Sequence, residues 1–79
     1  MQKQTFQILI GNRVKQLRKE KHLTQTDLAH LCGKDCQSLE RVENGKTNPT
    51  AFYLLEVCKA LDVSLNEFFD FKIEPPKKR

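Results

Sequence analysis

The sequence of 79 residues predicts an all-α domain of five short helices. Three observations support this fold class. Apolar residues recur at intervals of three and four, which places them on one face of a helix. No segment shows the alternation of apolar and polar residues that is typical of a half-buried strand. Capping residues and glycines separate the apolar segments, so each helix has a recognisable beginning or end.

The first helix is expected within FQILIGNRVKQLRKEK. One face of this segment is apolar and consists of Phe6, Ile10, Val14 and Leu17. Gly11 weakens the first turns, so a beginning near residue 5 and a beginning near residue 11 both stay open. The second helix is expected to begin after Thr24, because Thr24 and Asp27 have the spacing of a capping box, and to stop at Gly33.

The third helix is expected to open at Asp35, a favourable N-cap residue, and to run to Asn44 before Gly45 ends it. Thr50 is expected to cap a fourth helix. The residues of this helix that would face inward are Leu54, Val57, Cys58 and Leu61.

Ser64 and Glu67 have the spacing of a second capping box and are expected to open a short fifth helix, SLNEFF. The helical domain is therefore expected to span residues 1–71. Residues 72–79 contain two consecutive prolines, which cannot continue a helix, and are expected to form a flexible basic tail.

The formal net charge of +4 is unevenly distributed. Residues 1–46 have nine Lys and Arg against five Asp and Glu, whereas residues 47–74 have two against five. A basic first half suggests a surface for a polyanion, although scattered solvated charge would give the same totals. The sequence has no apolar run long enough to span a bilayer and no secretion signal, so we expect a cytoplasmic protein with reduced cysteines.

The stretch LCGKDC raises the question whether Cys32 and Cys36 form a metal or redox site. Cys32 is expected to point into the core and Cys36 outward, and neither His22 nor His30 is placed to complete a set of four zinc ligands. We therefore expect no metal, cofactor or disulfide. Oxidant sensing by Cys36 stays an open alternative. We also expect no catalytic activity, because no nucleophile–base pair, carboxylate dyad or phosphate-binding loop is present.

The second and third helices are separated by a turn of about three residues that contains Gly33, which is the outline of a helix-turn-helix. The residues of the third helix left outside the core are Cys36, Gln37, Ser38, Glu40, Arg41 and Asn44. Gln37 and Arg41 lie one turn apart, and each side chain can make two hydrogen bonds to a base edge in the major groove of DNA. Gln25, at the start of the second helix, can contact a phosphate.

The stretch TQTDLAHLCGKDCQSLERVENGKTNPT resembles, without a gap, the DNA-binding domains of lambdoid phage repressors and Cro proteins, and is similar to the xenobiotic-response-element family of bacterial regulators. The resemblance covers residues 8–69 and implies a lambda-repressor-like domain whose third helix reads DNA. It assigns base contacts to Cys36, Gln37 and Arg41, with Ser38 and Glu40 as variable contributors. It assigns phosphate contacts to Gln25, Asn44 and Lys46, with Arg13 as a further candidate. It also implies an ion pair between Arg18 and Glu43 that positions the third helix.

Two residues depart from the pattern of this family. Lys34 replaces the usual apolar turn residue, so we expect a more open corner between the two helices. Cys36 replaces a longer polar side chain, which shortens its reach toward a base.

The late apolar cluster is larger than one short helix can bury and consists of Leu65, Phe68, Phe69 and Phe71. We expect these residues to contribute to a homodimer interface, although closing a small core would also explain them. The expected function is that of a homodimeric transcriptional regulator, of the repressor or controller type, which binds a palindromic double-stranded DNA operator. The alternative is an antitoxin-like module that binds a protein and contacts DNA secondarily.

Overall fold

The computed structural model describes residues 1–72, and residues 73–79 lie outside the described part. Five helices follow one another in the predicted order, namely α1 (Lys3–Glu20), α2 (Gln25–Leu31), α3 (Cys36–Glu43), α4 (Ala51–Leu61) and α5 (Leu65–Phe68). Within residues 1–72 no strand occurs, and the predicted all-α fold class is confirmed. Of the predicted basic tail, only Lys72 belongs to the described part, where it is exposed. In the same part, no helix has the length and apolar character needed to cross a bilayer.

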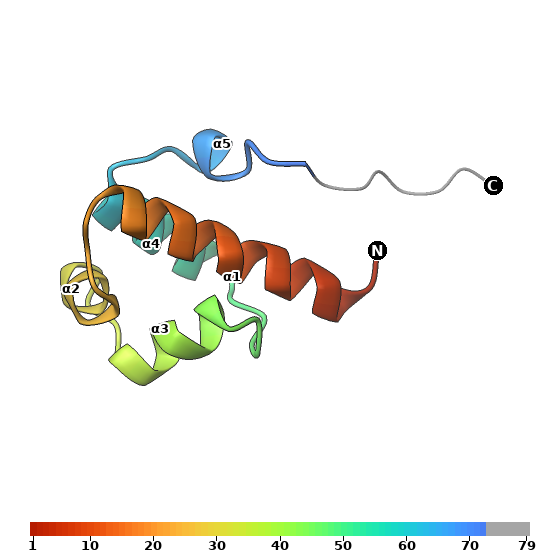
Figure 1. Ribbon diagram of the computed structural model, residues 1–79, viewed down its shortest axis with the longest axis horizontal. Helices are drawn as coiled ribbons and strands as arrows, with labels where there is room; N and C mark the ends of the chain where they lie inside the picture. Colours follow the sequence, from red (N-terminus) through yellow and green to blue (C-terminus); the bar gives the residue numbers. More distant parts are fainter. Residues whose placement is uncertain (73–79) are drawn as a thin grey trace.

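The longest helix, α1, is the central element of the fold (Figure 1). It has α3 on one side and α5 on the other, and α2 lies at the end where α1 finishes. α1 contacts both α3 and α4. The apolar core draws on all five helices and consists of Ile10, Val14, Leu17, Leu28, Ala29, Leu39, Val42, Leu54, Val57, Cys58, Leu61 and Phe68. The four inward residues predicted for α4 are all among them.

The beginning of α1 lies at Lys3, earlier than either predicted position. Gly11 is therefore inside the helix, where it is buried against the end of α3. A Cβ atom at Gly11 would lie 2.3 Å from the Val42 carbonyl oxygen and 2.6 Å from the Glu43 carbonyl oxygen. The glycine thus permits a close approach of two helices, and this contact offsets its poor helix propensity.

Side-chain caps begin three of the helices. Thr24 Oγ1 accepts a hydrogen bond from the Asp27 N–H at 3.0 Å, and Asp27 Oδ2 accepts one from the Thr24 N–H at 2.9 Å, so the predicted capping box of α2 is confirmed. Thr50 and Ser64 each accept a backbone N–H at 3.0 Å and begin α4 and α5. Asp35 occupies the predicted N-cap of α3, but its side chain makes no capping hydrogen bond.

Phe68 belongs to the core and not to the surface. Its side chain is fully buried, and its ring meets those of Phe69 and Phe71 edge-on at centroid distances of 5.0 and 6.4 Å. The prediction that Phe68 lies in a dimer interface is therefore wrong, because the single turn of α5 directs this ring into the protein. Leu65, Phe69 and Phe71 are half-buried and border the core.

Candidate nucleic-acid interface

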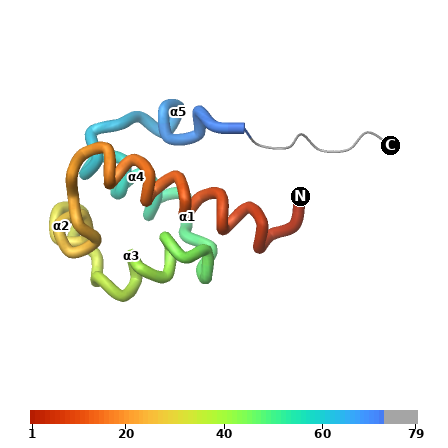
Figure 2. Tube along the Cα trace, viewed as in Figure 1, coloured from red at the N-terminus to blue at the C-terminus, as the bar shows by residue number. Residues whose placement is uncertain are grey.

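The two helices α2 and α3 form a helix-turn-helix with a tight turn. Figure 2 shows α2 almost end-on while α3 runs across the view, so the two helix axes cross steeply. Gly33 has a φ of +67°, a left-handed conformation that favours glycine, and the Lys34 N–H donates to the Ala29 carbonyl at 2.8 Å. Ala29 is buried, and its small side chain lets the helices approach closely. The turn therefore fixes the direction in which α3 leaves α2.

The exposed face of α3 carries three long polar side chains, Gln37, Glu40 and Arg41. Leu39 and Val42, on the opposite face, are buried in the core. Within the described residues, the three exposed side chains make no hydrogen bond or ion pair with the protein. Their donors and acceptors are therefore available to an external ligand.

Two further residues that the sequence assigned to base contacts, Cys36 and Ser38, are half-buried. Cys36 Sγ lies 3.7 Å from Thr26 Oγ1, and Ser38 Oγ lies 3.0 Å from Tyr53 Oη. Both side chains are turned toward neighbouring helices. Cys36 and Ser38 therefore do not join Gln37, Glu40 and Arg41 as exposed side chains without a partner.

The residues assigned to phosphate contacts differ in how they are placed. Asn44 and Lys46 are exposed and directly follow α3. Gln25 lies half-buried in the first turn of α2, where its Nε2 donates to Glu43 Oε1 at 3.0 Å. One amide hydrogen of Gln25 is thus used inside the protein, and the second stays available to a phosphate.

A buried ion pair joins α1 to the end of α3. Arg18 Nε lies 2.7 Å from Glu43 Oε2, and Arg18 Nη2 lies 3.1 Å from Glu43 Oε1, which is the two-pronged geometry of a strong charge-assisted contact. Arg18 Nη1 also donates to the Leu23 carbonyl at 2.7 Å. The exposed fractions of Arg18 and Glu43 are 8% and 1%. The pair therefore fixes the last turn of α3 relative to α1.

Arg13, the remaining candidate for a phosphate contact, lies elsewhere. Its guanidinium donates to the carbonyls of Phe68 at 2.7 Å and Glu67 at 2.6 Å, and lies 5.9 Å from the centre of the Phe71 ring. These carbonyls lie at the C-terminal end of α5, and the Glu67 carbonyl also accepts a hydrogen bond from the Asp70 N–H at 3.1 Å. Arg13 therefore faces α5, on the side of α1 opposite α3, and the structure does not group it with Asn44.

Lys34 connects the corner of the helix-turn-helix to α4, and the expectation of a more open corner stays a prediction. The Lys34 ammonium forms an ion pair with Glu56 on α4 and lies 4.7 Å from the centre of the Tyr53 ring. The hydrogen bond to Glu56 raises the pKa of Lys34. This contact has no local signal in the sequence, because Glu56 follows Lys34 by 22 positions.

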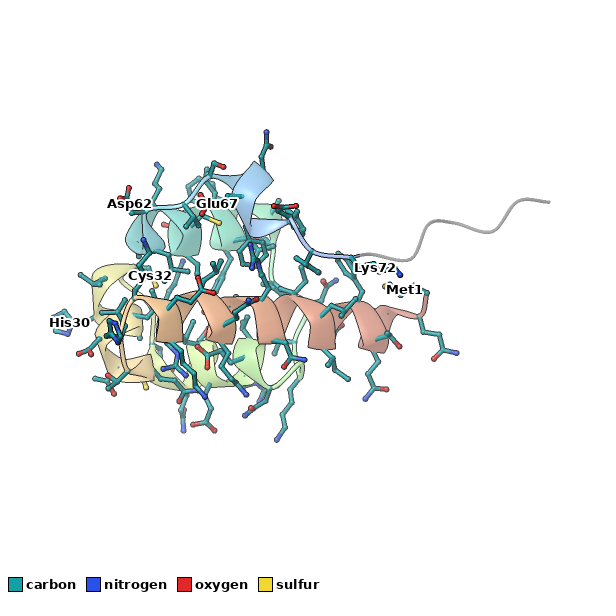
Figure 3. All side chains as sticks on the ribbon, turned by 45° about the horizontal axis from the view of Figure 1, so that its top comes forward. Met1, His30, Cys32, Asp62, Glu67 and Lys72 are labelled. Atoms are coloured by element: carbon teal, nitrogen blue, oxygen red, sulfur yellow. The ribbon has the colours of Figure 1, made fainter. Side chains whose placement is uncertain are left out.

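The cysteines do not converge on one site. Burial raises the pKa of the Cys32 and Cys58 thiols, which keeps both protonated near neutral pH. Figure 3 shows His30 projecting away from the body of the protein. Within residues 1–72, no three His, Cys, Asp or Glu side chains gather closely enough to hold a metal ion.

Comparisons with known proteins agree with this geometry. The helix-turn-helix family model HTH_3 matches residues 14–68. The HTH-type transcriptional regulator SinR of Bacillus subtilis (strain 168) is 40% identical over 67 residues, which cover 84% of this chain and 60% of SinR. The control protein C.MunI of Mycoplasma sp is 36% identical over 65 residues, which cover 81% of this chain and 88% of that protein.

A solved structure shows the same fold. The restriction-modification controller protein C.AhdI from Aeromonas hydrophila superposes with a TM-score of 0.79 and 34% identity, over 82% of this chain and 98% of that one. The predicted lambda-repressor-like fold and the predicted family are thereby confirmed. The chain belongs to the HTH_3 helix-turn-helix family, which is a family of DNA-binding transcription regulators and not of enzymes.

Proposed function

We propose that the chain regulates transcription by binding double-stranded DNA sequence-specifically as a homodimer, with α3 in the major groove. The observation that carries this proposal is the exposed face of α3, where Gln37 and Arg41 have no partner in the described part of the protein. The core residues Leu39 and Val42 and the buried Glu43 hold the opposite face in place. A rigid helix with unpartnered polar side chains is suited to reading base edges.

Gln37 and Arg41 are the proposed principal readers. A glutamine amide matches the N6 and N7 atoms of adenine, and a guanidinium matches O6 and N7 of guanine. The two residues are four apart and lie on the same face of α3, so they face neighbouring base pairs. Glu40, between them, can accept a hydrogen bond from the N4 amino group of cytosine. Binding requires no loss of an internal hydrogen bond at these positions.

The proposed phosphate contacts flank this helix. Lys46 and Asn44 follow the end of α3, and Gln25 lies at the start of α2. Contacts at both ends of the helix-turn-helix would set its register on the duplex without reading sequence. The basic balance of residues 1–46 supports a DNA-facing side on this half of the chain.

A homodimer would place two copies of α3 in successive major grooves. The proposed interface consists of Leu65, Phe69 and Phe71, since Phe68 is inside the core. The rings of Phe69 and Phe71 are stacked with a centroid distance of 6.1 Å and form a partly exposed apolar surface. Twofold pairing predicts a palindromic operator with half-sites about 34–36 Å apart.

Selection of genomic DNA fragments by the purified protein tests this function. The expected result is one inverted repeat, bound far more tightly than random duplex. Arg41→Ala and Gln37→Ala should each weaken operator binding by about 1–3 kcal/mol and relax the preference at one position. Lys59→Ala, an exposed charge on α4, serves as the matched control and should change neither property. If both reader variants bind the selected fragments like wild type, the antitoxin-like alternative with secondary DNA contact is favoured instead.

A further inference from the structure

The first part of α1 precedes the region that the family model matches. The helix begins at Lys3, whereas the match begins at residue 14, so about three helical turns lie ahead of it. Figure 1 shows this part of α1 reaching beyond the end of α3. None of the predicted DNA contacts except Arg13, which faces α5, falls in this segment.

Two contacts attach this segment to the loop that follows α3. Gln7 Nε2 donates a hydrogen bond to the Gly45 carbonyl at 3.1 Å. The backbone at Gly45 also lies directly against Ile8, because a Cβ at Gly45 would come within 2.7 Å of Ile8 Cγ1 and 3.0 Å of its Cα. Gly45 is therefore needed both for its φ of +71° and for this close approach. The first turns of α1 and the loop form one rigid surface.

An open groove of about 710 Å³ runs between these two segments. Lys3 and Gln7 line it on the α1 side, and Asn44 and Lys46 line it on the loop side. Among the residues that the structure describes, its lining includes two lysines and no carboxylate. The charge of the groove therefore favours an anion.

We propose that the first turn of α1 is part of the DNA interface and that Lys3 contacts a backbone phosphate next to the one held by Lys46. This proposal rests on the proposed function, which already places Asn44 and Lys46 on the DNA backbone. The groove continues that surface, and its open shape suits the side of a polymer better than a small enclosed anion. The segment ahead of the family match thus widens the footprint on DNA without adding sequence specificity.

The test is a fluorescence anisotropy titration of a labelled random-sequence duplex over a range of KCl concentrations. Each phosphate contact contributes about 0.9 to the slope of log K against log salt concentration. Lys3→Ala should reduce the slope by about 0.9, which corresponds to roughly eightfold weaker binding at 0.1 M salt. Lys46→Ala should give a similar change. Lys59→Ala removes the same charge from α4, away from the groove, and should leave the slope unchanged.

The outcomes separate this proposal from the proposed function. A wild-type slope for Lys3→Ala, with a reduced slope for Lys46→Ala, would overturn the role of α1 and leave the function intact. Equal reductions for Lys3→Ala and Lys59→Ala would also overturn it, because they would indicate an effect of net charge alone. No DNA binding by the wild-type protein would refute both. Gln7→Ala keeps every charge and removes one of the two contacts between α1 and Gly45, and it should weaken binding while the operator preference stays the same.

Discussion

Replacing Gly11 by alanine is expected to destabilise the protein, although glycine is a poor residue for a helix interior. On helix propensity alone, this change in an exposed helix would add about 1 kcal/mol to the free energy of unfolding. At Gly11 the new methyl group would meet three backbone atoms, with distances of 2.3 Å to the Val42 oxygen, 2.6 Å to the Glu43 oxygen and 2.9 Å to the Glu43 carbonyl carbon. Backbone atoms cannot rotate away as a flexible side chain can.

The magnitude follows from the shift that these distances require. Optimal contacts between non-bonded atoms lie near 3.5–4.0 Å, so α1 and α3 must separate by about 1 Å. Overpacking of a core costs about 1–3 kcal/mol, and a clash with three backbone atoms belongs at the upper end of that range. After the gain in propensity is subtracted, we expect a net loss of about 2 kcal/mol. For a domain of this size, such a loss lowers Tm by about 8–16 °C.

Urea unfolding followed by circular dichroism measures this loss, and Asn12→Ala provides the matched control. Asn12 is exposed on the same helix, so its replacement reports propensity without the clash and should slightly raise the midpoint. Gly11→Ala should lower the midpoint and also weaken DNA binding, because it displaces the last turn of α3. A midpoint for Gly11→Ala equal to or above that of wild type would refute the close-approach argument.

Three further outcomes are expected. Glu43→Ala should lower the free energy of unfolding, measured by urea titration, by about 3–5 kcal/mol, because the buried Arg18 loses its partner. The double variant Arg18→Met with Glu43→Leu should regain part of this loss, because it leaves no buried charge unpaired. His22→Gly should raise the urea midpoint by an amount equivalent to about 1 kcal/mol, since His22 has a φ of 58° that L-residues rarely adopt. Hydrogen bonds from the Thr24 backbone and side chain lower the pKa of Asp27 in the folded state. The ionised carboxylate therefore stabilises the fold above its ordinary pKa of 3.8, and this stabilisation is lost as the pH falls through the lowered pKa of the folded state. Asp27→Asn should therefore be less stable than wild type at neutral pH, and the difference should disappear in acid; a constant difference at all pH values would contradict this reasoning.

The helices were predictable because their signals are local. The Thr24 capping box, the Gly33 turn and the inward residues of α4 each depend on spacings within one element, and the structure contains all of them. The beginning of α1 was not predictable in the same way. In the sequence, Gly11 is a residue with poor helix propensity. Its presence inside the helix is explained only by the contact with the end of α3, about thirty positions later in the sequence.

In the candidate site, too, local spacing predicts the placement of some residues, and contacts distant in the sequence determine that of others. The exposure of Gln37 and Arg41 follows from the helical spacing of α3 once Leu39 is inside. The orientation of Ser38 depends instead on Tyr53 in α4, and that of Arg13 depends on the carbonyls that end α5. Contacts of this kind join residues more than ten positions apart, so a pattern along the chain does not contain them.

The central helix α1 connects the proposed DNA face to the proposed dimer surface. Gly11 and Arg18 hold the end of α3 on one side, while Arg13 binds the end of α5 on the other. These residues belong to one continuous helix, so the reading helix and the stacked rings of α5 are held in a fixed relation within each subunit. A homodimer built on α5 would therefore space its two copies of α3 rigidly. Such a protein should tolerate substitutions between half-sites far better than it tolerates a change in their separation. An inserted base pair moves one half-site along and around the duplex, so two rigidly spaced copies of α3 would no longer match both half-sites.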